Sequence, residues 1–587
     1  MRRSPVTVTG VVCALFVGCW TLVGCQQKPS PEKHTEAPTA NMGAPTSEKA
    51  VQHKLAGPPL SAPPPAPGQS FGGLGLQGSS PGGGGQGNSI GIGGIGTKGR
   101  GGGVGYGGGV GMSLGGKKMM GTGSGYTAPN TEEYRDWGVN PFVTAAEDRL
   151  STFAIDVDTA SYTLARRKVL EGTLPPREAV RVEEFLNYFR YSYPEPAPGT
   201  PLAVHLEAAP SPFTPGRHLL RVGVQGRRLS VSERKPAHLT FLVDVSGSMQ
   251  SPDKLPLAKR SLRMLVDSLR DGDTVALVTY AGGVKLALPP TGLERKALIH
   301  AAIEDLTAGG STAMASGIEL AYQQAMKTLD GQSLSRVIIL SDGDANVGPA
   351  SHEELLKLIR GYVKEGVTVT TVGFGMGNYK DTLMEQFANQ GNGNHYYVDS
   401  LMQARRIFQE QLGGTLEVIA QDVKLQVDFN PEQVARYRLV GYENRDIADR
   451  DFRNDTVDAG EIGSGHTVTA LYELELKPGA GAGLATVRVR AKKPRGETAA
   501  ERAYDFPAGA LAASFEQASP DLRFATAVMG AAEILRGSPH ARKWSLEPVL
   551  KIARGATPAG NAEREEFIAL LEKAQVLQGR VAAARAP

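Results

Sequence analysis

Between residues 236 and 412, short runs of apolar residues alternate with longer segments in which apolar side chains recur every three or four positions. The short runs are typical of strands buried on both faces of a parallel sheet. The longer segments place their apolar residues on one face of a helix. We expect strands at 239–243, 275–280, 337–340, 367–374 and 395–398. The pattern therefore predicts an α/β domain with a doubly wound, mostly parallel sheet and helices on both faces.

On either side of this domain, apolar and polar residues alternate, as in half-buried strands. Such strands are predicted at 202–208, 218–224, 416–429, 437–442, 466–476 and 485–489. Each group alone is short for a stable sandwich. We therefore expect the strands of 201–235 to share a sheet with those of 413–587. The α/β domain would then be inserted in, or flanked by, a β-sandwich.

Helical spacing predicts two further additions to this core. A helical extension is expected over residues 131–200, and helices end the C-terminal domain near 522–535, 546–552 and 564–576. Within the extension, Asp156-x-Asp158 is compatible with the nucleophile motif of haloacid dehalogenase phosphatases. That motif requires Thr or Val at the position occupied by Ala160. A charged turn or helix cap is the better interpretation.

The first 24 residues have the features of an export signal. Two arginines precede an apolar stretch over 6–23, which is slightly short for a membrane helix of about 20 residues and is interrupted by glycines. The segment ends in LVGC (22–25), which resembles a bacterial lipobox, so Cys25 is expected to carry lipid. Gln26, in place of aspartate, favours the outer membrane over the inner one. A helical anchor is the alternative.

Residues 25–130 are rich in proline and glycine and hold much of the chain's 73 glycines. Such a segment lacks the apolar content for a core, so we expect a disordered tether with a span of roughly 50–60 Å. The formal net charge is +3 with both signs interspersed, which argues against nucleic-acid binding. Cleavage of the signal would leave Cys25 as the only cysteine, so no internal disulfide is possible.

Oxygen-bearing side chains follow the predicted strands of the α/β domain. Asp244, Ser246 and Ser248 come at the end of the first strand, Thr312 follows a pair of glycines, and Asp342 follows the strand at 337–340. The carboxyl ends of parallel strands meet at one edge of the sheet, where ligands bind. Oxygen ligands suit a hard cation such as Mg²⁺. The alternative to a metal site is a turn that is rich in residues that cap helices and has no ligand.

The order D-x-S-x-S, Thr, Asp resembles the metal-ion-dependent adhesion site of von Willebrand factor type A (VWA) domains. The resemblance implies that Ser246, Ser248 and Thr312 ligate the metal directly, while Asp244 and Asp342 hold its waters. Mg²⁺ is expected, with Mn²⁺ or Ca²⁺ as alternatives. In the same family, a carboxylate of the partner completes the metal's coordination.

The whole arrangement resembles a bacterial family of VWA lipoproteins with an N-terminal extension and a C-terminal domain of unknown function. The resemblance rests on residues 150–162, 439–445 and 458–472 and covers about 140–587. It implies a non-enzymatic protein in the bacterial cell envelope, anchored by lipid, that binds a protein presenting Asp or Glu to the metal. An envelope scaffold with a structural or vestigial metal site is the alternative. A Mg²⁺-dependent hydrolase is a weaker one, with Ser341, Asp344 and Asn346 as its candidate groups.

Overall fold

The computed structural model describes residues 132, 134–155, 157–230, 232–311, 314–343, 351–375, 381–411, 414, 416–481, 483–507 and 509–585. All of them belong to one contact unit, Met119–Pro587. The predicted signal (1–24), Cys25, the predicted tether (25–130) and Thr312 lie outside the described residues. No helix among those described is both long and apolar enough to cross a membrane.

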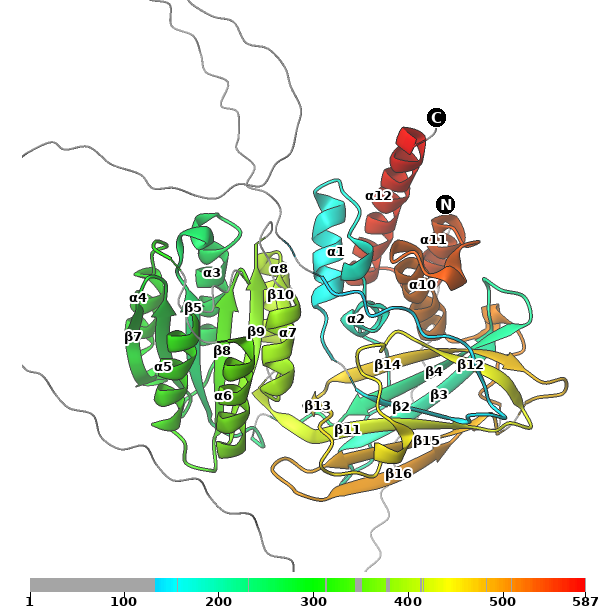
Figure 1. Cartoon of the computed structure of the whole chain (residues 1–587), viewed down its shortest axis with the longest axis horizontal. Coiled ribbons are helices and arrows are strands. Elements are labelled where there is room, and N and C mark those ends of the chain that lie inside the picture. Colours follow the sequence, from blue (N-terminus) through cyan, green and yellow to red (C-terminus); the bar gives the residue numbers. More distant parts are fainter. Residues whose placement is uncertain are drawn as a thin grey trace, which may run out of the picture. The chain divides into compact units, whose positions relative to one another are not determined.

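The α/β domain is built on a six-stranded sheet with the order β10-β9-β8-β5-β6-β7 (Figure 1). Five strands run parallel and β7 pairs antiparallel with β6. The strands are β5 (Ala237–Asp244), β6 (Thr274–Tyr280), β7 (Val284–Gly292), β8 (Leu334–Ser341), β9 (Val367–Phe374) and β10 (His395–Val398). The predicted doubly wound, mostly parallel sheet is confirmed. The hydrophobic pattern does not predict β7, because Pro289 and Pro290 interrupt its apolar run.

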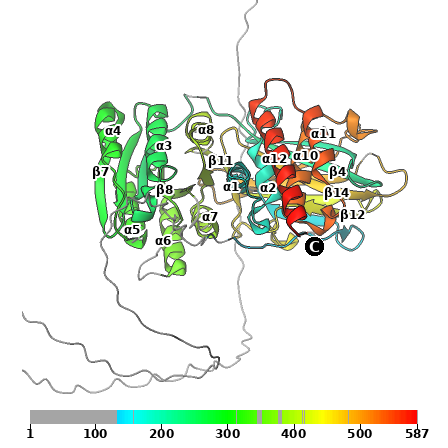
Figure 2. The same cartoon turned by 90° about the horizontal axis from the view of Figure 1, so that it is seen from above.

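Helices cover both faces of this sheet, and Figure 2 shows them in two rows. One face is covered by α3 (Leu255–Ser268), α4 (Lys296–Glu304), α8 (Leu401–Arg405) and the π-helical turn η4 (Arg406–Glu410). The other is covered by α5 (Met314–Met326), α6 (His352–Glu365) and α7 (Asp381–Gln390). Each helix buries the apolar stripe seen in the sequence, so these stripes are core. The last helix of the domain, α8, is an α-helix only to Arg405 and continues as the π-helical turn η4.

Two antiparallel sheets pack face to face and enclose a single apolar cluster. One has the order β1-β12-β14-β4-β3, and the other has the order β13-β11-β15-β16 with β2 also paired to β11. The strands are β1 (Val143–Thr144), β2 (Leu150–Ala154), β3 (Leu202–Pro210), β4 (Arg217–Gly226), β11 (Val418–Phe429), β12 (Val434–Val440), β13 (Gly460–Gly463), β14 (Thr467–Leu476), β15 (Ala485–Lys492) and β16 (Ala499–Asp505).

The strands before and after the α/β domain share one sheet, as expected. β4 pairs antiparallel with β14 from Arg217↔Glu475 to Gln225↔Thr467. The alternation along both strands turns their apolar residues inward, which fixes this register. The α/β domain is therefore inserted between strands of the sandwich.

The extension over 131–200, expected to be helical, is helical only in its second part. Its first part forms β1 and β2, and β2 pairs with β11 along Leu150–Ala154. The run Leu-Ser-Thr-Phe-Ala is short, and its burial depends on a partner strand far away in sequence. The rest is helical, with α1 (Ala160–Leu170) and α2 (Val182–Tyr188).

Three helices close the chain, α10 (Pro520–Leu535), α11 (Leu546–Gly555) and α12 (Ala562–Arg585). They form one apolar cluster with the extension. At its centre Phe189 lies 5.0 Å from Phe524 and 5.2 Å from Phe567, measured between ring centroids, in edge-on contacts. Aromatic pairs with this geometry are favourable beyond the area they bury. The extension and the C-terminal helices thus fold as one layer.

Candidate metal centre

The site begins at Asp244, the last residue of β5, in the middle of the parallel sheet. Its register neighbour on β6 is Tyr280, and Ser341 ends the adjacent strand β8. All three side chains therefore reach the same edge of the sheet, where the carboxyl ends of the strands meet.

The Asp244 carboxylate is fully buried and accepts three hydrogen bonds. Oδ1 accepts from the Ser246 backbone N–H at 2.9 Å, while Oδ2 accepts from the hydroxyls of Ser341 (3.0 Å) and Tyr280 (3.2 Å). Burial, and to a smaller extent the negative charge of Asp342, raise the pKa of Asp244 to about 6 against the lowering effect of the serine hydrogen bonds. This carboxyl group is thus held rigidly and close to a second one.

Ser246 and Ser248 lie on the turn that follows β5. Their hydroxyl oxygens are 3.0 Å apart, and Ser246 is buried. The short 3-10 helix η2 (Gly247–Gln250) begins directly after Ser246 and brings the second hydroxyl back over the first. Two hydroxyls at this distance can face one small ion together.

Asp342 follows β8 and is fully buried. Its Oδ2 accepts from Lys254 Nζ at 2.8 Å, and the lysine side chain is only 8% exposed. Lys254 could not be found from the sequence, because nothing in the spacing of one lysine before a helix distinguishes it from a surface cation. The aliphatic part of this side chain packs against Gly375, where an added Cβ would lie 2.3 Å from Lys254 Cε.

The segment that leads to Thr312 is fastened to the first loop. Gly247 donates its N–H to the Gly310 carbonyl at 3.0 Å, and Gly309 donates to the Val245 carbonyl at 2.8 Å. Gly310 has a φ of +86°, a conformation that favours glycine. Thr312 itself lies outside the described residues. The structure therefore brings Asp244, Ser246, Ser248 and Asp342 together, and it directs the glycine loop toward them.

These residues fit a hard divalent cation. The set combines hydroxyl oxygens with two buried carboxylates, and Asp342 raises the pKa of Asp244 by charge repulsion. Oxygen ligands of this kind suit Mg²⁺, Mn²⁺ and Ca²⁺. Asp244, Ser246, Ser248, Thr312 and Asp342 would hold the ion, which when bound supplies a positive charge that accepts a further oxygen ligand. Lys254 supplies one charge that partly offsets the two acids.

Two other residues considered from the sequence, Asp158 and His395, are hydrogen-bonded to groups of the protein that hold the fold together. Asp158 accepts from the His395 backbone N–H (2.8 Å) and from Arg445 (3.2 Å), so it joins the extension to the α/β domain and the sandwich. The His395 ring is buried against the Thr371 hydroxyl at 2.9 Å. Asp156 lies outside the described residues. Asp158 therefore has structural partners, in line with the interpretation preferred over a phosphatase nucleophile, but it does not cap α1, whose N-terminal cap is Thr159 without a side-chain hydrogen bond.

Three family matches divide the chain as the fold does. The von Willebrand factor type A domain family matches residues 238–410, a family described as von Willebrand factor matches 128–221, and the family "Uncharacterized protein YfbK, C-terminal" matches 414–577. The solved structure titled "von Willebrand factor type A from Catenulispora acidiphila" is similar over 65% of this chain and 91% of that one, with a TM-score of 0.38 and 16% identity.

Two curated relatives illustrate the range of similarity. The protein sll0103 of Synechocystis sp. (strain ATCC 27184 / PCC 6803 / Kazusa) is 28% identical over 191 residues, which is 32% of this chain and 44% of that protein. The protein YfbK of Escherichia coli (strain K12) is 38% identical over 476 residues, covering 76% of this chain and 81% of YfbK. At that identity and coverage, the chain belongs to the YfbK family of bacterial proteins with a von Willebrand factor type A domain.

Proposed function

We propose that this protein is a lipid-anchored, non-enzymatic binding protein of the bacterial cell envelope. It would capture a partner protein through a divalent cation held by Asp244, Ser246, Ser248, Thr312 and Asp342. The observation that supports this most is the buried Asp244 carboxylate, which is fixed by three hydrogen bonds beside two serine hydroxyls 3.0 Å apart. A preformed oxygen cage at the carboxyl edge of a parallel sheet is suited to ligand binding.

The kind of partner follows from charge. Ser246 and Ser248 are neutral donors of oxygen, so the ion they hold keeps most of its positive charge. The two acids, Asp244 and Asp342, are buried and already hydrogen-bonded or ion-paired within the protein. An Asp or Glu of a partner is therefore the group that this site favours.

The scaffold alternative has one observation in its favour. The Lys254 ammonium group already contacts Asp342, so a protein cation stabilises one of the two buried acids. The hydrolase alternative has no such support. Ser341 donates its hydroxyl hydrogen to Asp244, and Asp344 and Asn346 lie outside the described residues.

Anchoring is proposed through Cys25, because the LVGC segment closes an export signal. Cys25→Ala should then leave uncleaved precursor. Maturation and membrane fractionation identical to the wild type would contradict lipid attachment. This test concerns the anchor alone and leaves the metal site unaffected.

The binding function is tested by affinity capture with the full chain. Envelope proteins are incubated with it in Mg²⁺, in EDTA, and in EDTA followed by excess Mg²⁺, and captured proteins are identified by mass spectrometry. We expect a specific partner that is lost with EDTA, recovered with Mg²⁺, and absent with Asp244→Ala. Capture that is indifferent to both EDTA and Asp244→Ala would favour the scaffold.

A further inference from the structure

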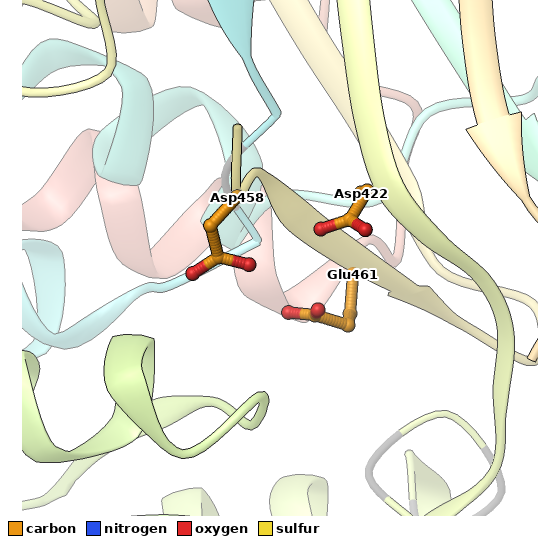
Figure 3. Close-up of side chains that lie close together, drawn as sticks. All are labelled: Asp422, Asp458 and Glu461. Atoms are coloured by element: carbon orange, nitrogen blue, oxygen red, sulfur yellow. The ribbon is translucent and has the colours of Figure 1, made fainter. Parts of the chain in front are cut away.

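A group of three acidic residues lies in the sandwich, outside the α/β domain. Asp422, Asp458 and Glu461 each place a carboxylate oxygen within 4.8 Å of the others. Figure 3 shows the three carboxyl groups turned toward a common space between β11 and the chain that leads into β13. Asp422 lies on β11, while Asp458 and Glu461 belong to the segment 458–472, for which the sequence indicates no chemical role.

Glu461 is the unusual member of this cluster. Its side chain is turned into the group, the residue is only 9% exposed, and Oε1 has no hydrogen-bond partner among the described residues. A buried carboxylate without a partner is costly, because nothing replaces the water it has lost. The surroundings of Glu461 are therefore incomplete, and what is missing is a positive group or a donor inside the acidic space.

The cations near this cluster leave Glu461 Oε1 without a hydrogen-bond donor among the described residues. Lys492 Nζ contacts Asp422 Oδ2 at 2.6 Å and also donates to the Asp455 carbonyl at 2.7 Å. The charges of Arg336 and Arg445 act on Glu461, while Arg336 donates a hydrogen bond to Thr370 and Arg445 donates to Asn389 and Asp158. Burial raises the pKa of Glu461 well above its ordinary value in spite of these two arginines.

The backbone is shaped to bring Asp422 into the cluster. β11 contains an irregularity here, with register shifts between Ala420 and Val423 against β13 and between Gln421 and Lys424 against β15. Asp422 has a φ of +49°, which is uncommon for a residue with a side chain. The bulge re-aims this side chain, and its Oδ1 accepts from the Ala459 N–H at 3.2 Å.

We propose that Asp422, Asp458 and Glu461 form a binding site for a divalent cation of the Ca²⁺ class. Ca²⁺ is bound by oxygens at roughly 2.3–2.6 Å, so opposite ligands lie up to about 5 Å apart, whereas the corresponding limit for Mg²⁺ is about 4.2 Å. Oxygens within 4.8 Å of one another therefore suit the larger ion without rearrangement. The site is separate from the proposed Mg²⁺ centre, and the proposal of Ca²⁺ binding here does not depend on Mg²⁺ binding there.

The position of the site indicates what the cation would do. Asp458 and Glu461 flank the start of β13, which pairs with β11 from Val423↔Gly460 to Val418↔Gly463. Ser464, just after β13, donates its N–H to the Glu417 carbonyl at 2.8 Å. A cation shared between the two strands would fasten the start of β13 to the bulge of β11, at the end of this ladder opposite the Ser464–Glu417 hydrogen bond. The cation would thus stiffen the ladder that follows the point where the chain leaves the α/β domain.

The test is Ca²⁺ binding by calorimetry to the full chain carrying Asp244→Ala, which removes the first site. We expect one equivalent of Ca²⁺, with the affinity reduced at least tenfold when Glu461→Gln is added. Glu417→Gln is the matched control, since Glu417 is also buried, near β11, and outside the cluster. It should leave Ca²⁺ binding unchanged.

Asp458→Asn provides a second variant in case Glu461→Gln does not fold, because Asp458 is exposed and its replacement leaves the core intact. It should also reduce the affinity at least tenfold. Absence of Ca²⁺ binding in the Asp244→Ala protein would overturn the proposal. Binding that Asp458→Asn leaves unchanged would overturn it as well.

Discussion

Lys254 and Asp342 form a buried ion pair at the rim of the candidate metal centre, with Nζ 2.8 Å from Oδ2. The lysine stands at the N-terminal cap of α3, and the aspartate follows β8. Asp244 and Asp342 repel each other when no metal is bound. The ammonium group of Lys254 offsets this repulsion by stabilising the charge of Asp342. Lys254 is therefore in competition with the cation for the charge of Asp342.

Lys254→Met should destabilise the metal-free protein more than the metal-bound one. Removing one partner of a buried pair leaves an uncompensated charge and costs about 3–5 kcal/mol. Added Mg²⁺ should recover more of the free energy of unfolding in the variant than in the wild type, as measured by urea denaturation. Lys259→Met on the same helix, whose contacts with Glu304 lie at the surface, is the control. An equal loss with and without Mg²⁺ would contradict this competition.

A second relationship connects the extension to the last helix of the α/β domain. Arg166 of α1 donates two hydrogen bonds to Asp399, at 2.8 and 2.5 Å, just before α8, and its side chain is only 2% exposed. Arg166→Met should cost on the order of 3 kcal/mol and speed hydrogen exchange over 399–410.

The matched control is Arg190→Met, because Arg190 pairs with Glu410 at the surface, where ion pairs contribute little. Exchange over 399–410 that is equally slow in both variants would show that α1 does not restrain this helix.

His466 should make stability depend on pH. Removal of the ring from water, and to a smaller extent the charge of Arg336, lower the pKa of His466 from 6.5 to about 4. Between these values the unfolded chain binds a proton that the folded chain does not. The free energy of unfolding therefore falls as pH drops from about 6.5 to about 4, by up to roughly 3 kcal/mol for this group.

The measurement is urea unfolding at pH 7 and pH 4.5 for the wild type and for His466→Gln. The variant should lose less stability between the two pH values than the wild type does. Comparing the two proteins cancels groups that titrate in both, Asp244 included. Identical losses would mean that His466 binds a proton as readily in the folded protein as in the unfolded one.

Dividing the chain between residues 413 and 414 should destabilise both pieces. The first would keep β4 without its partner β14, and the second would keep β14 and β11 without β4 and β2. Apolar faces of the sandwich would then be exposed, and we expect binding of a hydrophobic dye and loss of cooperative unfolding. A fragment that unfolds cooperatively at the wild-type midpoint would contradict the shared sheet as a source of stability.

The sequence predicted most of the fold where the pattern was local. The strands of the α/β domain other than β7 are continuous apolar runs, and the alternation of strands and helices along the chain predicts a mostly parallel sheet. The pattern does not predict β1, β2, β7, β13 or β16; β2 is defined by a distant partner strand, and β7 carries Pro289 and Pro290. The pairing of β4 with β14 was accessible because each group of strands alone is too small for a sandwich.

For the candidate metal centre, the sequence predicts the metal-binding residues of the motif but not the other side chains that contact them. Asp244, Ser246 and Ser248 share one turn, so their proximity follows from spacing. Lys254 reaches Asp342 across 88 positions of sequence. The acidic cluster of Asp422, Asp458 and Glu461 depends on a β-bulge, which leaves no clear mark in a hydrophobic pattern.

The most direct test of the central claim is Mg²⁺ binding to the full chain, measured by calorimetry, for the wild type, Asp244→Ala and the surface control Asp330→Ala. The account predicts one site for Mg²⁺ in the wild type and in the control, and at least a hundredfold weaker binding in Asp244→Ala, with the far-UV circular dichroism unchanged. Equal Mg²⁺ affinity in all three proteins, or no Mg²⁺ binding by any of them, would contradict it.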